Sequence, residues 1–149
     1  GVGAVVFHDL KNDRMNNFDF TIDEVVQFEG NTGPYVQYSR VRALSILENS
    51  QAVLDPKQVQ GLEDDHAWSV VKLLEQFPQV LFRSYKDYDP SLIAKYVLDL
   101  TQAFNKYYAN VRILNEDKEL SARLSLVRAV EILIKINLHL LGIASPKKM

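Results

Sequence analysis

The segment from residue 119 to residue 141 constrains the fold most, because it is apolar on most sides of the helix that its spacing predicts. Its polar residues follow helical steps along one narrow stripe: Arg128, Glu131, Lys135 and His139. Glu131 and Lys135 are four residues apart, in the order that favours an ion pair. Gly142 suits the left-handed conformation that often follows a helix, and Pro146 prevents continuation. A helix with so little polar surface is expected in the middle of a bundle.

The rest of the chain carries further helix signals. Apolar residues step by four and three from Ile93 to Val111, which predicts an amphipathic helix that starts after Asp89-Pro90. Thr21 and Glu24 form a capping box. Pro78 removes a helical hydrogen bond, so we expect one helix to end before it and another to begin at it. The predicted helices are 22–28, 34 to about 52, 64–77, 78–86, 90–111 and 119–141. Residues 4–10 fit either a short strand or a helix, and periodicity does not separate the two.

These signals predict an all-α fold, a bundle of about five or six helices. The chain has no cysteine, which excludes disulfides and thiolate metal sites and suits a reducing compartment. No apolar run approaches the roughly 18 residues of a membrane span, and no export signal is found, so we expect a cytoplasmic protein without a membrane partner. The net charge of −2 argues mildly against nucleic acid, yet residues 118–149 hold six basic and two acidic side chains.

One helix face combines aromatic rings with a positive charge. Pro34 follows Gly33 and marks a helix start, after which Tyr35, Tyr38 and Arg42 fall on one face. Aromatic and guanidinium planes stack on unpaired bases, and the charge attracts phosphates. The ordinary alternative is a pair of half-buried core tyrosines, and spacing alone does not decide between the two. The glycine-rich turn before Pro34 lacks the Lys and Ser/Thr of a phosphate-binding loop.

Residues able to make or break a covalent bond are not found in a working arrangement. The three histidines are far apart in sequence, and the acidic residues before His66 are typical of a helix cap. No metalloprotease, nucleophile-elbow or calcium-loop motif occurs. We therefore predict no catalytic residue and no metal site in this chain, and a small hydrolase is disfavoured.

Three blocks closely resemble arginyl-tRNA synthetases of the bacterial type: FEGNTGPYVQYSRVR at 28–42, AFNKYYANVRIL at 103–114 and NLHLLGIASPKKM at 137–149. The resemblance implies the C-terminal anticodon-binding domain of a class I aminoacyl-tRNA synthetase over residues 21–149. Residues 1–20 would be the end of the catalytic region or a connector to it, helical at 4–10. The implied partner is tRNA(Arg), with no DNA partner and a monomeric state. The family charges this tRNA with arginine using ATP and Mg, in a catalytic domain that these residues do not contain. The chain itself would bind no cofactor.

The resemblance also implies which residues meet the anticodon loop. Tyr38 would stack on an extruded base, Arg42 would contact a phosphate or base edge, and Tyr35 would lie alongside. Either Tyr107 or Tyr108 would supply a second aromatic wall, and we favour Tyr107 because Tyr108 fits the apolar stripe better. The chain end would lie beside the same pocket: Lys147, Lys148 and Met149. The alternative function is a helical protein–protein interaction module without RNA binding, which the near-neutral charge favours.

Overall fold

The computed structural model describes residues 32–50 and 62–148, and these residues form helices and connections without strands. The helices are α3 (Gly33–Glu48), α4 (Asp65–Lys86), α5 (Ser91–Asn110) and α6 (Leu120–Leu140). The all-α prediction is confirmed for this part of the chain. Residues 1–31, with the expectations for 4–10 and 22–28, lie outside the described residues.

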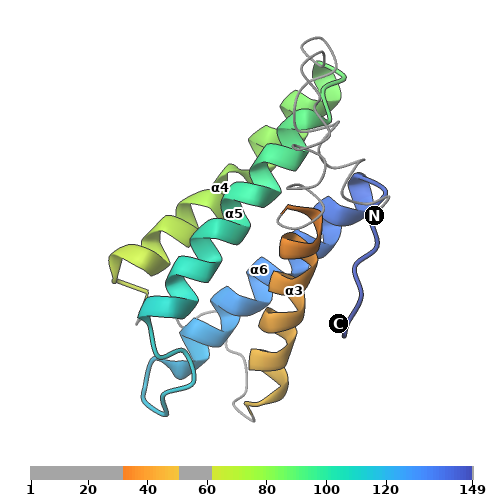
Figure 1. Cartoon of the computed structure of the whole chain (residues 1–149). Coiled ribbons are helices and arrows are strands. Elements are labelled where there is room, and N and C mark those ends of the chain that lie inside the picture. The colour runs from red at the N-terminus through yellow and green to blue at the C-terminus, as the bar shows by residue number, and fades with distance from the viewer. Residues whose placement is uncertain (1–31, 51–61, 149) are drawn as a thin grey trace.

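The helices pack as two pairs (Figure 1). α4 runs along α5, α3 runs along α6, and α5 and α6 join the pairs. The core between them is made of fully buried side chains from several helices, among them Val36, Leu100, Phe104, Val130 and Ile134. α6 contacts each of the other three helices, as expected for the middle of a bundle.

The outer side of α6 is nevertheless open to solvent. Ile132, Ile136 and Leu140 are exposed, although the segment is apolar on most sides. The helices of the described part therefore cover α6 on its inner sides only. None of the four helices is long and apolar enough to cross a membrane, as judged over the described residues.

The predicted break at Pro78 is wrong. α4 continues through it as one helix of 22 residues, so the described part holds four helices where the sequence predicted five. Pro78 is exposed, and α4 is held to α5 by contacts just before it. The Tyr96 hydroxyl donates a hydrogen bond to the Leu73 carbonyl at 2.6 Å, and the Tyr96 and Phe77 rings stack at 5.6 Å between centroids. Burial of that hydroxyl raises the pKa of Tyr96. We attribute the continuity of α4 to this packing, which outweighs one missing helical hydrogen bond.

The predicted end of the first described helix at about residue 52 is wrong, because α3 ends at Glu48, but two other predicted helix ends are confirmed. Asp64 caps α4 by accepting a hydrogen bond from the Ala67 amide at 2.8 Å. Gly142 follows α6 with a φ of +72°, in the left-handed region. Arg123 of α6 holds the connection between α5 and α6: it donates to the carbonyls of Ile113 and Asn115 and to the Asp117 carboxylate. The hydrogen bond from Arg123 lowers the pKa of Asp117.

The expected ion pair between Glu131 and Lys135 is not formed. Glu131 is only 3% exposed and pairs with Arg40 of α3 at 2.9 Å and with Arg128 at 3.1 Å. Lys135 is exposed. The reason is tertiary: α3 presents a buried guanidinium to this side of α6, and a buried carboxylate needs such a partner.

Candidate nucleic-acid interface

Arg42 lies between two tyrosine rings that come from different helices. Its Cζ atom is 4.4 Å from the centroid of the Tyr108 ring on α5 and 5.3 Å from that of Tyr38 on α3. Both distances fall within the range of cation–π attraction. Tyr38 is 51% exposed and Tyr108 is 44% exposed, so each ring keeps a large part of its surface open.

Asn105 of α5 holds this arrangement together. Arg42 Nη1 donates to Asn105 Oδ1 at 2.6 Å, while Asn105 Nδ2 donates to Tyr35 Oη at 2.9 Å and to Ser39 Oγ at 2.8 Å. The Ser39 hydroxyl donates in turn to the Tyr35 carbonyl at 2.8 Å. Because both ends of the amide are used, Arg42 and Tyr35 are fixed relative to each other. We call the resulting surface the tyrosine–arginine face, made of Tyr35, Tyr38, Arg42, Asn105 and Tyr108.

Sequence reasoning missed Asn105 and Ser39. Ser39 is fully buried, and its role depends on α5 lying beside α3. Asn105 lies three residues before Tyr108, on the part of α5 that faces α3. A polar residue at helical spacing from an exposed tyrosine, within one of the resembling blocks, is the one signal that could have pointed to it.

The preference for Tyr107 as the second aromatic wall is wrong. Its side chain is fully buried, whereas Tyr108 is the ring that meets Arg42. The two tyrosines lie on opposite edges of the apolar stripe of α5, and spacing does not show which edge is covered. Burial raises the pKa of Tyr107, the charge of Asp64 adds to this, and Arg123 opposes it. Tyr107 therefore lies on the covered edge of α5 and Tyr108 on the open one.

The buried hydroxyl of Tyr107 has no hydrogen-bond partner among the described residues. We therefore expect Tyr107→Phe to change the free energy of unfolding by less than about 1 kcal/mol, or to raise it, because a buried unpaired hydroxyl gives no compensation for its lost hydration. Chemical denaturation of the two proteins measures the difference. A decrease above about 2 kcal/mol, as for a hydroxyl with a good partner, would contradict this.

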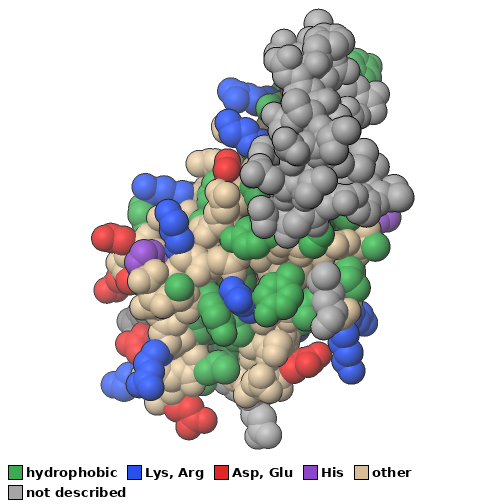
Figure 2. Space-filling model, viewed as in Figure 1, with side chains coloured by type: hydrophobic (Ala, Val, Ile, Leu, Met, Phe, Trp, Pro, Cys, Tyr) green, Lys and Arg blue, Asp and Glu red, His purple; other side chains and the backbone are tan. Residues whose placement is uncertain are grey.

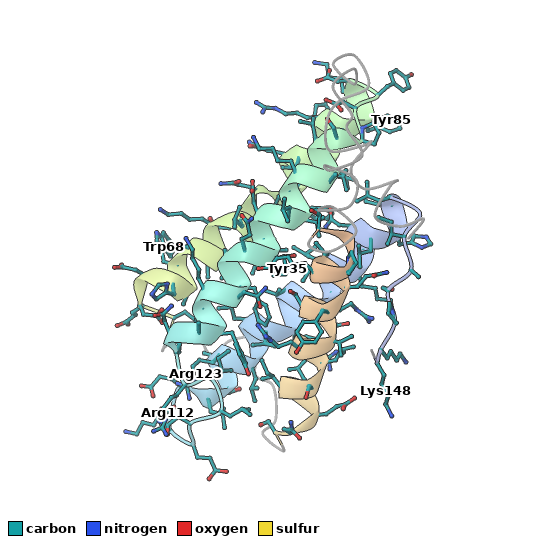
Figure 3. All side chains as sticks on the ribbon, viewed as in Figure 1. Tyr35, Trp68, Tyr85, Arg112, Arg123 and Lys148 are labelled. Carbon is teal, nitrogen blue, oxygen red and sulfur yellow. The ribbon has the colours of Figure 1, made fainter. Side chains whose placement is uncertain are left out.

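Lys147 and Lys148, two of the predicted residues at the chain end, lie on the other side of α3. Gln37 Nε2 donates to the Ala144 carbonyl at 2.9 Å, so residues 141–148, here called the C-terminal tail, return along α3. Figure 3 shows Tyr35 on the side of α3 that faces α5 and Lys148 beyond the opposite side. Lys147 and Lys148 are exposed, and Met149 lies outside the described residues. The structure thus gathers Tyr35, Tyr38, Arg42 and Tyr108, and leaves the two lysines apart.

The tyrosine–arginine face is suited to bind flat, negatively charged ligands. Figure 2 shows hydrophobic and basic side chains next to one another at the centre of this side of the molecule. Half-exposed rings give stacking surfaces, and a guanidinium adds charge and a second flat surface. Nowhere in residues 32–50 and 62–148 do three or more His, Cys, Asp or Glu side chains gather so that they could hold a metal ion. Unpaired nucleotides combine the flat and anionic chemistry that such a face fits.

The sequence of this chain matches a known protein family. The family described as the DALR anticodon binding domain matches residues 36–149, and the chain belongs to this family. Similar proteins narrow the class further. The chain is 56% identical to an arginine–tRNA ligase of Enterococcus faecalis and 52% identical to arginine–tRNA ligase 2 of Bacillus anthracis, in both cases over the whole chain. The chain spans about a quarter of the length of these relatives, 26% in each case.

Two solved structures of arginyl-tRNA synthetases are similar to this chain. The arginyl-tRNA synthetase of Plasmodium falciparum superposes with a TM-score of 0.85 at 29% identity, over 99% of this chain and 27% of that one. The enzyme of Thermus thermophilus gives a TM-score of 0.79 at 31% identity, over 99% of this chain and 26% of that one. Both similarities extend over the helices that carry the tyrosine–arginine face.

Proposed function

We propose that this chain binds the anticodon loop of tRNA(Arg) as the anticodon-binding domain of an arginine–tRNA ligase. The longer protein would join arginine to the tRNA with ATP and Mg, and this chemistry would take place outside these residues. Membership of the anticodon-binding family and high identity to arginine–tRNA ligases support the proposal. We also propose that the helical domain covers residues 21–149, that residues 1–20 are the end of the catalytic region or a connector, and that the protein works as a monomer in the cytoplasm.

The observation that carries the proposal is the position of Arg42 between the rings of Tyr38 and Tyr108. Tyr38 and Tyr108 would each stack on an unpaired base, because every base offers a flat face to an aromatic ring. Arg42 would contact a phosphate or a base edge with the guanidinium nitrogens that Asn105 does not use. Tyr35, whose hydroxyl is already bonded to Asn105, would act mainly in positioning.

Replacing Tyr38 by alanine tests the proposal. We expect affinity for an anticodon stem-loop of tRNA(Arg) to fall by about 1–2 kcal/mol, within the range of one stacking contact. Helicity should stay unchanged, because the ring is half exposed. Fluorescence anisotropy with labelled RNA at two salt concentrations measures this, and wild-type affinity should fall steeply with salt.

The matched control is Tyr85→Ala, which removes an exposed tyrosine of α4 that is 82% exposed. Its affinity should equal that of the wild type. Equal affinities for Tyr38→Ala and the wild type would show that the ring does not contact RNA.

The alternative function is a protein-interaction module without RNA binding. The exposed apolar side of α6 at Ile132, Ile136 and Leu140 favours it, as does the net charge of −2. Such a module would show no salt-dependent RNA binding in the same anisotropy experiment. Family membership supports the RNA-binding function instead.

A further inference from the structure

We propose that Arg40 is a positioning residue for RNA binding: it anchors the C-terminal tail to α3 and so holds Lys147 and Lys148 where they can reach RNA bound at the tyrosine–arginine face. The inference rests on the proposed function. It concerns a side chain that points away from the tyrosine–arginine face and is only 2% exposed.

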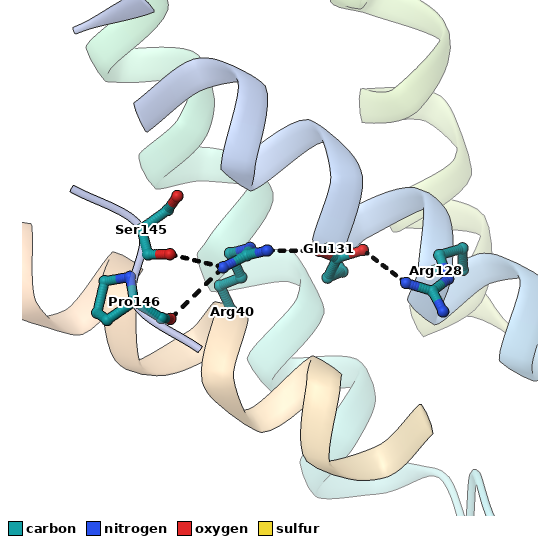
Figure 4. A network of polar contacts seen from close by, with 5 residues as sticks. All are labelled: Arg40, Arg128, Glu131, Ser145 and Pro146. Carbon is teal, nitrogen blue, oxygen red and sulfur yellow. Dashed lines mark hydrogen bonds and ion pairs between the residues drawn. The ribbon is translucent and has the colours of Figure 1, made fainter. Parts of the chain in front are cut away.

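The guanidinium of Arg40 joins three parts of the fold (Figure 4). Nη1 donates to the Ser145 carbonyl at 2.8 Å and to the Pro146 carbonyl at 3.4 Å, while Nη2 donates to Glu131 Oε1 at 2.9 Å. These contacts connect α3 to α6 and to the tail. The planar fork of an arginine is what allows one side chain to bind a carboxylate and two carbonyls at once.

Glu131 determines the orientation of Arg40. Its carboxylate is buried, and its second oxygen accepts from Arg128 at 3.1 Å. With Nη2 of Arg40 held by this carboxylate, Nη1 is directed at the tail. The carbonyls of Ser145 and Pro146 lie beyond the end of α6, so they have no helical partner and are free to accept.

The anchor lies directly before the two lysines. Gln37 holds Ala144 and Arg40 holds Ser145 and Pro146, so the next residue is Lys147. Pro146 restricts its own φ, which further limits the paths that the tail can take. The lysines therefore leave the surface of α3 at a defined place. Without the anchor, their charges would spread over many conformations, and RNA binding would have to order them.

RNA bound at the tyrosine–arginine face has a short path to these lysines. The tail and Tyr108 lie on opposite sides of α3, and a helix with its side chains is about 10–12 Å across. A loop whose bases stack near Tyr38 can therefore extend its backbone over α3 toward the tail. Lys147 and Lys148 would then meet phosphates while the aromatic rings meet bases.

A double-mutant cycle tests the proposal. The first change is Arg40→Met with Glu131→Leu, which removes the anchor without leaving a buried charge unpaired. The second is Lys147→Ala with Lys148→Ala. Each pair alone should weaken binding of the anticodon stem-loop by about threefold to tenfold and reduce the salt slope by about 0.7 for each phosphate that is no longer neutralised. All four changes together should bind no more weakly than the lysine pair alone, because Arg40 acts through the lysines.

Tail mobility is the second readout. In ¹⁵N relaxation measurements, the amides of Ser145, Lys147 and Lys148 should become mobile in the Arg40→Met/Glu131→Leu protein, with order parameters below about 0.6. Ala144, which Gln37 still holds, and the core should stay rigid. Lys135→Ala is the matched control: it removes an exposed cation of α6 without touching Arg40, and should change neither readout.

Two results would overturn the inference about Arg40, and a third would refute the proposed function instead. A tail that stays ordered in the Arg40→Met/Glu131→Leu protein would overturn the inference whether or not RNA binds. A mobile tail with the same further decrease in affinity when the lysines are already absent would also overturn it, since Arg40 would then act independently of them. A wild-type chain that binds no RNA would instead refute the proposed function.

Discussion

Arg42→Ala is expected to weaken binding of the tRNA(Arg) anticodon stem-loop by about 3 kcal/mol, roughly 150-fold. Arg42 contacts both half-exposed rings and is bonded to Asn105, so its removal takes away a charge and frees the two aromatic walls together. This places the effect above that of a single stacking ring. Fluorescence anisotropy at constant salt gives the two affinities.

Two further variants show whether the shape of the Arg42 guanidinium, its charge or the net charge of the chain causes that decrease. Arg42→Lys keeps the charge but not the flat guanidinium, and we expect it to recover only a small part of the affinity. Arg83→Ala removes an exposed arginine near the end of α4 and should bind like the wild type. Full recovery by Arg42→Lys would mean that Arg42 acts only as a point charge. A decrease in Arg83→Ala as large as that in Arg42→Ala would mean that binding depends on net charge rather than on this face.

The largest effect on stability is expected at Glu131. Glu131→Ala should lower the free energy of unfolding by about 3–5 kcal/mol, because it leaves the Arg40 guanidinium buried without its carboxylate. Replacing both partners, Arg40→Met with Glu131→Leu, should restore the stability to within about 1 kcal/mol of the wild type or above it. Urea denaturation of the three proteins measures this.

The double variant separates two roles of the buried pair. If it is as unstable as Glu131→Ala, the pair itself stabilises the packing of α3 on α6. If it is stable, the pair is not needed for stability, and its role is to position the C-terminal tail.

The fold could be predicted largely from local signals, because helical periodicity and helix caps depend on residues that are close together in the sequence. The acidic residues before His66 were predicted to cap a helix, and Asp64 does so. Gly142 is left-handed as predicted, and α6 contacts each of the other three helices, although its outer side is exposed. Pro78 shows where local rules fail, since its effect on α4 was decided by α5. The stacking and hydrogen bonding of Tyr96 depend on a helix that begins 13 residues later, which no local pattern around Pro78 contains.

The candidate site was predicted in part for the same reason. Tyr35, Tyr38 and Arg42 belong to one helix, so their spacing placed them on one face. The second wall came from α5, and choosing between Tyr107 and Tyr108 required knowing which edge of α5 the bundle covers. Asn105 and the Arg40–Glu131 pair depend on contacts between helices far apart in sequence. Periodicity shows which residues share one face of a helix. Which other helix packs against that face depends on the tertiary structure.

We propose that the tyrosine–arginine face receives unpaired bases of the anticodon loop. The most direct test of this proposal is a solution NMR titration of the isotope-labelled chain with the anticodon stem-loop, following the ring and guanidinium signals. We predict the largest shifts at Tyr38, Arg42 and Tyr108, and none when a stem closed into a continuous duplex replaces the loop. Shifts that instead centre on Trp68 or Tyr85 of α4, with Tyr38, Arg42 and Tyr108 unchanged, would contradict the claim.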